Sequence, residues 1–511
     1  MYSKALSAAI CGIDAFIISV EADVSDGLPM FDLVGYLGSE VREARERVRV
    51  SIKNSGFFID PKRITINLSP ADIRKEGTGF DLPIAISILT AFGFIHQDSL
   101  ENTLFIGELG LNGDIKKVNG VLPIVYAARK KGFKRCIVPT NNINEAAIVD
   151  KIDIYGVSTI RQVVNFLNNE VYLEPHFVDI SNSNFSDDAC DQLDFSDVLG
   201  QDTAKRGLEI AACGMHNILM IGAPGSGKTM LAKRVPTIMP ELTLDESLQI
   251  SKIYSISGLL SNDQYLIKRR PFRSPHHTIT TTALAGGGRT PMPGEISLAH
   301  LGVLFLDELP EFKRSTLETL RQPLEDNEVT ITRLLGSYRF PSDFMLVSAM
   351  NPCECGHYPD RNKCHCSPSQ INKYLGKISK PLIDRIDLCV EALPILYKEL
   401  SGKVKAESSA SIREKIKKGR EFQMERYKEE SINFNSQLTT RMIKKYCKID
   451  KEEKEILEYY FHNLDLSARA YHRILKVSRT IADLDQSDKI LVRHISEAIR
   501  YRNLDKKYWE S

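Results

Sequence analysis

The sequence predicts a multidomain α/β protein built around a central parallel sheet, and three observations lead to that prediction. Residues 222–229 form a glycine-rich loop, GAPGSGKT, between an apolar run at 217–221 and a helix-compatible segment, which is the strand–loop–helix context of a phosphate-binding loop. Two further apolar runs, 303–306 and 344–350, each end in a polar residue, as buried parallel strands do. The 511 residues leave room for about three domains. The balance of 67 basic and 66 acidic residues excludes a strong global field for a polyanion.

The first domain is predicted to be α+β and to span residues 1–172. Ala15–Val20 and Arg63–Leu68 have the composition of strands. Residues 81–92 are mostly apolar, as a buried helix is, and Asn112-Gly113 has the residue types of a hairpin turn. A domain of this size is expected to have its own core.

The rest of the chain divides where its composition changes. Residues 173–193 contain a polar run and are expected to be a linker, and 194–398 is the domain that carries the glycine-rich loop. Residues 399–438 are rich in lysine and glutamate at helical spacing, which predicts a solvated connecting helix. Apolar side chains recur at helical spacing in residues 439–511, which predicts a small helical lid.

The glycine-rich loop is expected to bind the phosphates of a nucleoside triphosphate. Its glycines let backbone N–H groups approach phosphate oxygens, and the following helix adds the partial positive charge of its N-terminus. Lys228 is expected to reach the β- and γ-phosphates, and the Thr229 hydroxyl to complete the shell of a Mg²⁺ ion. The residues expected to contact the nucleotide are Gly222, Ala223, Pro224, Gly225, Ser226, Gly227, Lys228 and Thr229.

Hydrolysis also requires groups that hold the metal and orient a water molecule. Asp307 ends the apolar run at 303–306 and is expected to hold Mg²⁺, and Glu308 is expected to orient and polarise the attacking water. Asn351 ends the next apolar run, where its amide can hydrogen-bond the γ-phosphate or the water. The alternative for Asn351 is a turn residue before Pro352.

Two arginines are candidates for neutralising charge on the transferred phosphoryl group. Arg385 lies between apolar residues and is expected to be exposed and to reach the nucleotide of a neighbouring subunit. Arg469 follows Ser467, a helix-capping residue type, and is expected to contact the γ-phosphate from the lid. The alternatives are a surface pair of Asp384 with Arg385, and an arginine on an ordinary helix face.

Four cysteines cluster directly after Asn351. Cys353 and Cys355 form one C-x-C pair, and Cys364 and Cys366 form a second. Two such pairs joined by a short loop can supply the four thiolates of a tetrahedral Zn²⁺ site, so zinc is predicted here. An ordinary loop remains the alternative.

The order of these motifs resembles that of the AAA+ ATPases. The longer strings Asp197–Gln201, Arg273–Thr278 and Pro293–His300 resemble the Mg-chelatase-like branch, specifically the bacterial ComM (YifB-like) family, over nearly the whole chain. The resemblance implies that the protein uses ATP and Mg²⁺, assembles into a ring expected to be hexameric, and has DNA as a partner. It also adds three nucleotide contacts, Val198, Gly200 and Gln201.

Two hairpins inserted into the central domain resemble the pore loops of ring helicases. One contains the glycine run 286–288, and the other comprises 328–333 and 337–340. Glycines let a loop approach a partner backbone closely, and arginines near them can contact phosphates. The side chains expected to contact DNA are Arg273, His276, Arg289 and Arg333. The alternative is a set of basic surface loops with no ligand.

The first domain resembles the Lon-protease-type fold, which is that of the second domain of ribosomal protein S5. The segments 75–82 and 106–123 parallel the serine-bearing and lysine-bearing segments of that family. The serine position falls on Gly79 and the lysine position on about Leu122, and neither side chain can act as nucleophile or base. We therefore expect a binding or assembly domain rather than a peptidase.

The resemblance implies an ATP-driven ring motor that remodels DNA, a branch-migration helicase acting in recombination or transformation. The alternative is a chelatase-like ATPase subunit or chaperone for metal insertion or complex assembly, which the Lon-like first domain disfavours. A third, an ATP-dependent protease, is disfavoured by Gly79 and Leu122. No apolar run is long enough to span a membrane and no signal peptide is evident, so a cytoplasmic protein is expected.

Overall fold

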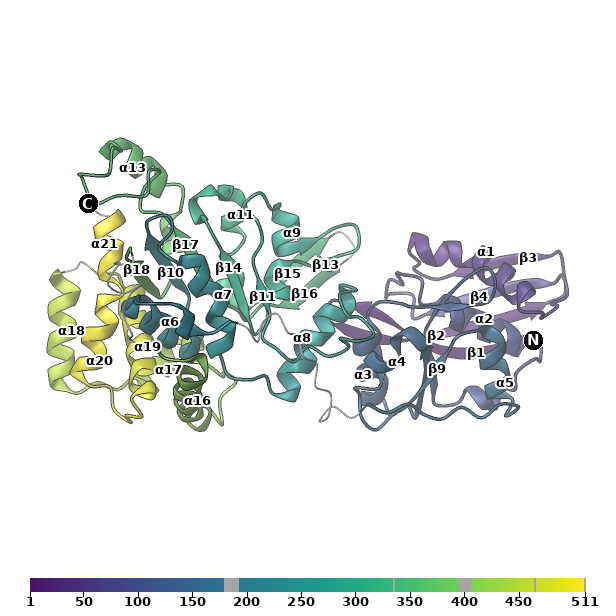
Figure 1. Cartoon of the computed structure of the whole chain (residues 1–511). Coiled ribbons are helices and arrows are strands. Elements are labelled where there is room, and N and C mark those ends of the chain that lie inside the picture. The colour runs from purple at the N-terminus through teal and green to yellow at the C-terminus, as the bar shows by residue number, and fades with distance from the viewer. Residues whose placement is uncertain (179–192, 334–335, 395–405, 464–465, 510–511) are drawn as a thin grey trace.

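A computed structural model describes residues 1–178, 193–333, 336–394, 406–463 and 466–509 (Figure 1). An α+β domain, a sheet-based domain and a helical region follow one another along the chain. Most of the predicted linker, 179–192, and the start of the predicted connecting segment, 399–405, lie outside the described residues. Within the described ranges, every helix is too short or too polar to cross a membrane.

The first domain is a seven-stranded mixed sheet in the order β3-β4-β2-β1-β5-β8-β9. Strand β1 pairs antiparallel with β2 from Tyr2 opposite Asp23 to Cys11 opposite Asp14. Helix α2 is buried along its whole length, which explains its nearly continuous apolar sequence. The predicted strands, buried helix and hairpin turn are confirmed. The elements are β1 (Tyr2–Cys11), β2 (Asp14–Ser25), β3 (Met30–Val34), α1 (Ser39–Asn54), β4 (Arg63–Ser69), α2 (Asp81–Ala91), β5 (Thr103–Phe105), β6 (Glu108–Leu109), β7 (Ile115–Lys116), α3 (Val121–Lys130), β8 (Arg135–Pro139), α4 (Ile143–Ala146), β9 (Asp153–Val157) and α5 (Ile160–Leu167).

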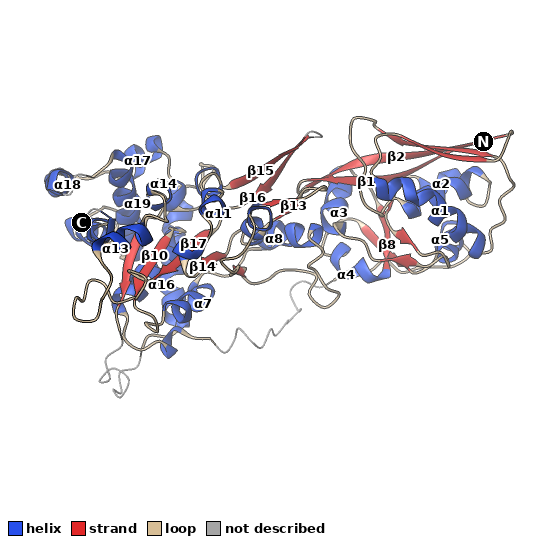
Figure 2. Ribbon diagram, turned by 90° about the horizontal axis from the view of Figure 1, so that it is seen from above, coloured by secondary structure: helices blue, strands red, loops and turns tan. Residues whose placement is uncertain are grey.

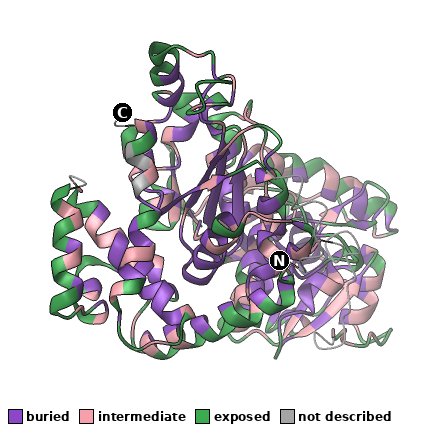
Figure 3. Ribbon diagram, turned by 60° about the vertical axis from the view of Figure 1, so that its left-hand side comes forward, coloured by how far each residue is buried: buried purple, intermediate pink, exposed green. Residues whose placement is uncertain are grey.

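The central domain contains a five-stranded parallel sheet in the order β11-β14-β17-β10-β18. The apolar runs at 303–306 and 344–350 form β14 and β17, which are buried on both faces as the strands of parallel sheets are (Figure 3). The elements are α6 (Asp202–Gly214), β10 (Ile218–Gly222), α7 (Lys228–Ile238), α8 (Leu244–Ile256), β11 (Phe272–Arg273), α9 (Thr281–Ala285), β12 (Gly286–Gly287), β13 (Met292–Pro293), α10 (Glu295–Leu298), β14 (Val303–Leu306), α11 (Arg314–Glu318), α12 (Pro323–Asp326), β15 (Glu328–Arg333), β16 (Gly336–Pro341), β17 (Met345–Met350), α13 (Pro368–Leu375), α14 (Lys380–Ile383) and β18 (Leu388–Ala392).

Both predicted hairpins are present and lie side by side. β12 pairs with β13, and β15 pairs with β16. A Cβ placed on Gly287 would stand 3.1 Å from Nη2 of Arg333, so glycine lets the two hairpins approach closely. They lie on the side of the central domain that faces the first domain (Figures 1 and 2). There the β1–β2 turn contacts β16, since a Cβ on Gly12 would stand 2.9 Å from the carbonyl oxygen of Arg339.

The first and central domains also meet at helix α8. The carboxylate of Glu145 accepts hydrogen bonds from the Leu122 N–H and the Ser255 hydroxyl, and it is buried. The Gly120 N–H donates to the carbonyl of Ser255 at 3.1 Å.

Lys252 of α8 lies over the ring of Tyr126, with Nζ 3.4 Å from the ring centroid. Leu266, ten residues beyond α8, is buried in the apolar core of the first domain. The two domains therefore share an interface at α8 that contains both polar and apolar contacts.

The C-terminal region is helical, as predicted, but its first helix is not a solvated connector. α16 (Ser409–Arg426) buries Ile412 and Ile416, and Gln423 donates to the carbonyl of Cys213 in α6 at 3.1 Å. Charged residues on the exposed side of α16 concealed this buried stripe in the sequence. The remaining helices are α17 (Thr440–Tyr446), α18 (Lys451–Asn463), α19 (Ala468–Leu484), α20 (Val492–Arg500) and α21 (Asn503–Trp509).

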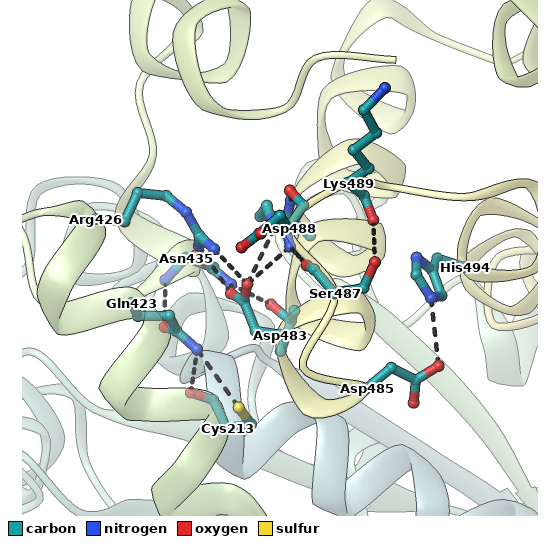
Figure 4. Close-up of polar contacts among 12 residues, drawn as sticks. Cys213, Gln423, Arg426, Asn435, Asp483, Asp485, Ser487, Asp488, Lys489 and His494 are labelled. Carbon is teal, nitrogen blue, oxygen red and sulfur yellow. Dashed lines mark hydrogen bonds and ion pairs between the residues drawn. The ribbon is translucent and has the colours of Figure 1, made fainter. Parts of the chain in front are cut away.

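A buried carboxylate holds this region together (Figure 4). Asp483 of α19 accepts hydrogen bonds from Arg426, Arg479 and Asn435 at 2.9, 3.0 and 2.8 Å, and its side chain is fully buried. Because a buried charge is stable only when it is paired, this network fixes α16 against α19.

Candidate nucleotide site

Three of the predicted catalytic residues, Asp307, Glu308 and Asn351, lie with the glycine-rich loop at one edge of the parallel sheet. β10 leads into the glycine-rich loop, β14 ends before Asp307, and β17 ends before Asn351. Strands β10 and β14 both pair with β17 in parallel, so their carboxyl ends lie together. Side chains separated by more than a hundred residues in sequence are thereby placed in hydrogen-bonding range.

Lys228 and Thr229 connect the loop to the other two strand ends. Lys228 Nζ donates to the carbonyl oxygens of Gly222 and Ala223 at 2.7 and 2.9 Å, and to Oδ1 of Asn351 at 3.3 Å. Burial lowers the pKa of Lys228, and the nearby Asp307 carboxylate opposes that shift. The Thr229 hydroxyl donates to Oδ2 of Asp307 at 2.6 Å. This hydroxyl–carboxylate pair offers the oxygen ligands that Mg²⁺ prefers, so the residues fit the metal that the loop motif implies.

Glu308 lies at the start of a turn and is held by a histidine that the sequence did not single out for catalysis. Its φ of 52° is left-handed, and its side chain is exposed. Oε2 of Glu308 lies 3.5 Å from Nδ1 of His277, whose ring stacks on that of His276 at a centroid distance of 4.0 Å. His277 follows β11, so the loop expected to contact DNA also contacts the residue expected to orient water.

The segment before the loop lies against the glycine-rich loop. The Gln201 amide donates to the carbonyl of Ser226 at 3.1 Å and also to that of Leu393. Gly200 and Gln201 both have left-handed backbones, with φ of 62° and 60°, and Val198 is buried. Gln201 thus holds the glycine-rich loop against the end of β18.

The two arginines do not lie at this edge of the sheet. The prediction that Arg385 is exposed is wrong, because its side chain is buried. Arg385 is 8% exposed, and its carbonyl accepts a hydrogen bond from Asn217, which precedes β10. Arg473, one turn beyond Arg469, donates to the carbonyl of Ile386 at 3.2 Å. Both arginines therefore lie near the amino ends of β10 and β18, roughly 16 Å from the loop along a five-residue strand.

The four cysteines of the cluster converge. Sγ of Cys353 lies 3.3 Å from that of Cys355 and 3.8 Å from that of Cys364, and all four sulfur atoms lie within 4.8 Å of one another. Although burial opposes the shift, hydrogen bonds from the His357 N–H and from the thiols of Cys353 and Cys366 lower the pKa of Cys355 to about 6. The loop adjoins the nucleotide site, because a Cβ on Gly356 would stand 2.4 Å from Cδ of Pro224.

The residues expected to contact DNA divide into two groups. Arg273 is a strand residue of β11 and forms a two-pronged pair with Glu295, at 2.6 and 2.7 Å, so its guanidinium is already engaged. His276, Arg289 and Arg333 are exposed. Arg339 of β16, which was not predicted to contact DNA, is also exposed and lies on the same hairpin as Arg333.

The fold and site define a P-loop ATPase of the AAA+ class. The phosphate loop, the acidic pair and the asparagine each follow a strand of one parallel sheet, as they do in that class. Family models described as "Magnesium chelatase, subunit ChlI", "Subunit ChlI of Mg-chelatase" and "Magnesium chelatase, subunit ChlI C-terminal" match residues 194–400, 20–142 and 406–502.

Full-length relatives narrow the class to one family. The chain is 44% identical to the competence protein ComM of Haemophilus influenzae over 502 residues, which cover 97% of this chain and 96% of that protein. It is 42% identical to YifB of Escherichia coli over 503 residues, with coverages of 98% and 96%. The Lon protease 2 of Bacillus subtilis matches over 141 residues at 30% identity, covering 27% of this chain and 25% of that one. The chain belongs to the ComM/YifB family of Mg-chelatase-related AAA+ ATPases.

The first domain was expected to disfavour a chelatase subunit, and these matches do not support that expectation. A family model named for a chelatase subunit covers residues 20–142, so the presence of the first domain does not by itself separate the chain from chelatase subunits. In that domain a Cβ on Gly79 would stand 3.1 Å from Ile106, and Leu122 is fully buried.

The arrangement can hold and hydrolyse a nucleoside triphosphate. Mg²⁺, when bound, would neutralise negative charge on the phosphates. Lys228 and the glycine-rich backbone are placed to bind phosphates, Thr229 and Asp307 are placed to hold the metal, and Asn351 is placed to orient a γ-phosphate oxygen or water. Glu308 can accept a proton from water once its carboxylate turns from His277 toward the phosphates.

Proposed function

We propose that this chain is the subunit of a ring-forming ATPase that binds and remodels DNA, with branch migration as its activity and a hexamer as its working state. One observation supports the proposal of a ring. The groups proposed to act in hydrolysis are divided between the carboxyl ends and the amino ends of the strands. The phosphate loop, Asp307 and Asn351 lie at one edge, and Arg385 and Arg469 at the other. A second copy placed head to tail supplies the missing arginines, and a repeated head-to-tail contact closes into a ring when the rotation permits.

The two adjacent hairpins support the proposal that DNA is the ligand. Arg289 and Arg333 are exposed on them, and Arg339 adds a third guanidinium on β16. A near-neutral chain can still bind a polyanion strongly when a few cations per subunit are repeated around a pore. The similarity to a competence protein over nearly the whole chain favours DNA over other polyanions.

The alternative is an ATPase subunit that drives metal insertion or complex assembly, as the names of the three family models suggest. The full-length identity to ComM argues against it, because that relative covers all domains of this chain.

The test measures ATP turnover with and without four-way branched DNA. Lys228→Ala is expected to lose nucleotide binding, whereas Glu308→Gln is expected to bind ATP and leave it unhydrolysed, since only activation of water is removed. Normal turnover by Glu308→Gln would falsify the catalytic assignment. A wild-type protein whose turnover ignores branched DNA, and which does not convert branched substrates, would favour the chelatase-like alternative.

The DNA contacts have their own test. Replacing Arg289 and Arg333 by glutamine should weaken binding to all sequences and reduce its salt dependence, the behaviour of phosphate contacts. Arg273→Gln is a different case, because its partner Glu295 would be left half-buried and unpaired, so a loss of stability is expected there. Wild-type branch conversion by the Arg289, Arg333 double variant would move the DNA contact to the first domain.

A further inference from the structure

Arg385 and Arg469 converge on one carboxylate, that of Glu325 in α12. Arg385 donates from Nη2 to Oε1 of Glu325, and Nη2 of Arg469 lies 3.9 Å from the same oxygen. The hydrogen bond from Arg385 lowers the pKa of Glu325, although partial burial opposes the shift, and Arg469 and Arg321 lower it further. At neutral pH, then, a single negative charge holds both arginines.

The hydrogen bonds of Arg385 show that the Glu325 carboxylate occupies a donor position of the guanidinium that an anion could take. Nη1 of Arg385 donates to the carbonyl of Pro381 at 2.6 Å, and Nη2 donates to Glu325. Nε is buried and has no hydrogen-bond partner among the described residues. The side chain of Glu325 is 49% exposed and that of Arg469 is 62% exposed, so the two lie where an incoming anion would arrive. Carboxylates and phosphates take the same donors of a guanidinium, so Glu325 holds the position that a phosphoryl oxygen would take.

Glu325 is also attached to the base of a hairpin that is expected to grip DNA. It lies three residues before β15, on a helical turn in which its N–H donates to the carbonyl of Gln322 at 3.0 Å. Asn327, with a left-handed φ of 54°, joins that turn to β15, and its carbonyl accepts from the Ser342 N–H beyond β16 at 2.8 Å. Only Asp326 and Asn327 separate Glu325 from β15, so a displacement of the hairpin would reach Glu325 directly along the chain.

We propose that Glu325 is a positioning residue that keeps Arg385 and Arg469 from the neighbouring subunit's phosphate until hairpin β15–β16 is displaced by DNA. This rests on the proposed function, because it needs a ring in which those arginines meet a γ-phosphate. Glu325 and the phosphate compete for the same donors and repel one another, so turnover is slow while the carboxylate is in place. Movement of the hairpin draws Glu325 away and links DNA binding to hydrolysis at the adjacent site.

The decisive variant is Glu325→Gln, which keeps the size of the side chain and removes its charge. Turnover without DNA is expected to rise on the order of tenfold, within the range of ordinary coupling between sites, and the further stimulation by branched DNA to shrink accordingly. Glu318→Gln is the matched control, because Glu318 pairs with Arg321 at 2.8 Å rather than with Arg385, and it should leave both rates unchanged. Light scattering after gel filtration verifies that each variant assembles like the wild type.

Two further results decide the case. The gain in Glu325→Gln should disappear when Arg385→Ala is added, because the released arginine is its cause. Turnover of Glu325→Gln at or below the wild-type rate, or failure to assemble, overturns the proposal and makes Glu325 a structural partner of Arg385. Wild-type turnover that ignores DNA overturns the proposed DNA function instead, while the comparison of basal rates still decides whether Glu325 restrains the arginines.

Discussion

Zinc binding by the cysteine cluster is a prediction whose geometry can be worked out in advance. Four thiolates at about 2.3 Å from a tetrahedral Zn²⁺ stand roughly 3.8 Å from one another. Sulfur–sulfur distances of 3.3 Å between Cys353 and Cys355, 3.8 Å between Cys353 and Cys364, and 3.6 Å between Cys355 and Cys364 differ from that value by a few tenths of an ångström. All four sulfur atoms, that of Cys366 included, lie within 4.8 Å of one another, so metal binding requires the most separated sulfur atoms to approach by up to about 1 Å.

The perturbation is the pair of changes Cys355→Ser and Cys366→Ser, which removes one ligand from each C-x-C pair. Plasma emission spectrometry of reduced protein should find about one zinc per wild-type chain and almost none in the variant. Gly356 packs against Pro224 of the phosphate loop, so loss of the metal should also raise the KM for ATP, on the order of tenfold, by loosening that loop.

Cys11→Ser is the matched control, because Cys11 ends β1 and lies outside the cluster. It should keep both the metal and the KM. Zinc-free wild-type protein, or a double variant that retains its zinc, would refute the geometric reasoning.

Three other predictions concern catalysis and stability. Arg385→Ala should abolish turnover with little change in ATP affinity, and mixing it with Lys228→Ala subunits should restore activity at interfaces that pair two intact halves; no rescue in assembled mixtures contradicts a shared site. His277→Ala should raise basal turnover up to about fivefold, the worth of an exposed pair, by freeing Glu308, and an unchanged rate would show that the pair does not restrain it. Burial raises the pKa of Asp343 to about 6, so the native state binds the extra proton and stability falls as pH rises from about 4 to 6, by up to about 3 kcal/mol. Asp343→Asn should therefore raise the melting temperature at pH 8 and leave it nearly unchanged at pH 4, and equal shifts at both would contradict this.

The sequence predicted the groups that follow strands better than the groups that lie between elements. Lys228, Asp307 and Asn351 could be placed because each follows a buried strand, and parallel strands bring their carboxyl ends to one edge. Arg385 was expected to be exposed, since nothing in its neighbouring sequence points to Glu325, sixty residues earlier. Arg273 was expected to be free for DNA for a similar reason, because its partner Glu295 lies beyond a hairpin.

The same limit explains what was missed at the nucleotide site and in the helical region. His277 is an ordinary loop histidine until the fold brings it to Glu308. The buried stripe of α16 is short and alternates with lysines, so its pattern is weaker than the tertiary contacts that hold Gln423 against Cys213. Local pattern determines the elements, whereas side-chain partners across the fold determine which charges remain available.

The interface at α8 has a mechanical consequence. α8 follows the helix that begins at Lys228, and Ser255, near its end, is hydrogen-bonded to the first domain. Side-chain contacts at α8 therefore connect the nucleotide-binding domain to the first domain by a route that does not include residues 179–192. Proteolytic cleavage within those residues should leave two fragments that copurify and remain coupled, whereas Glu145→Ala, which removes the carboxylate shared by Leu122 and Ser255, should separate the response of the two domains in an intact chain.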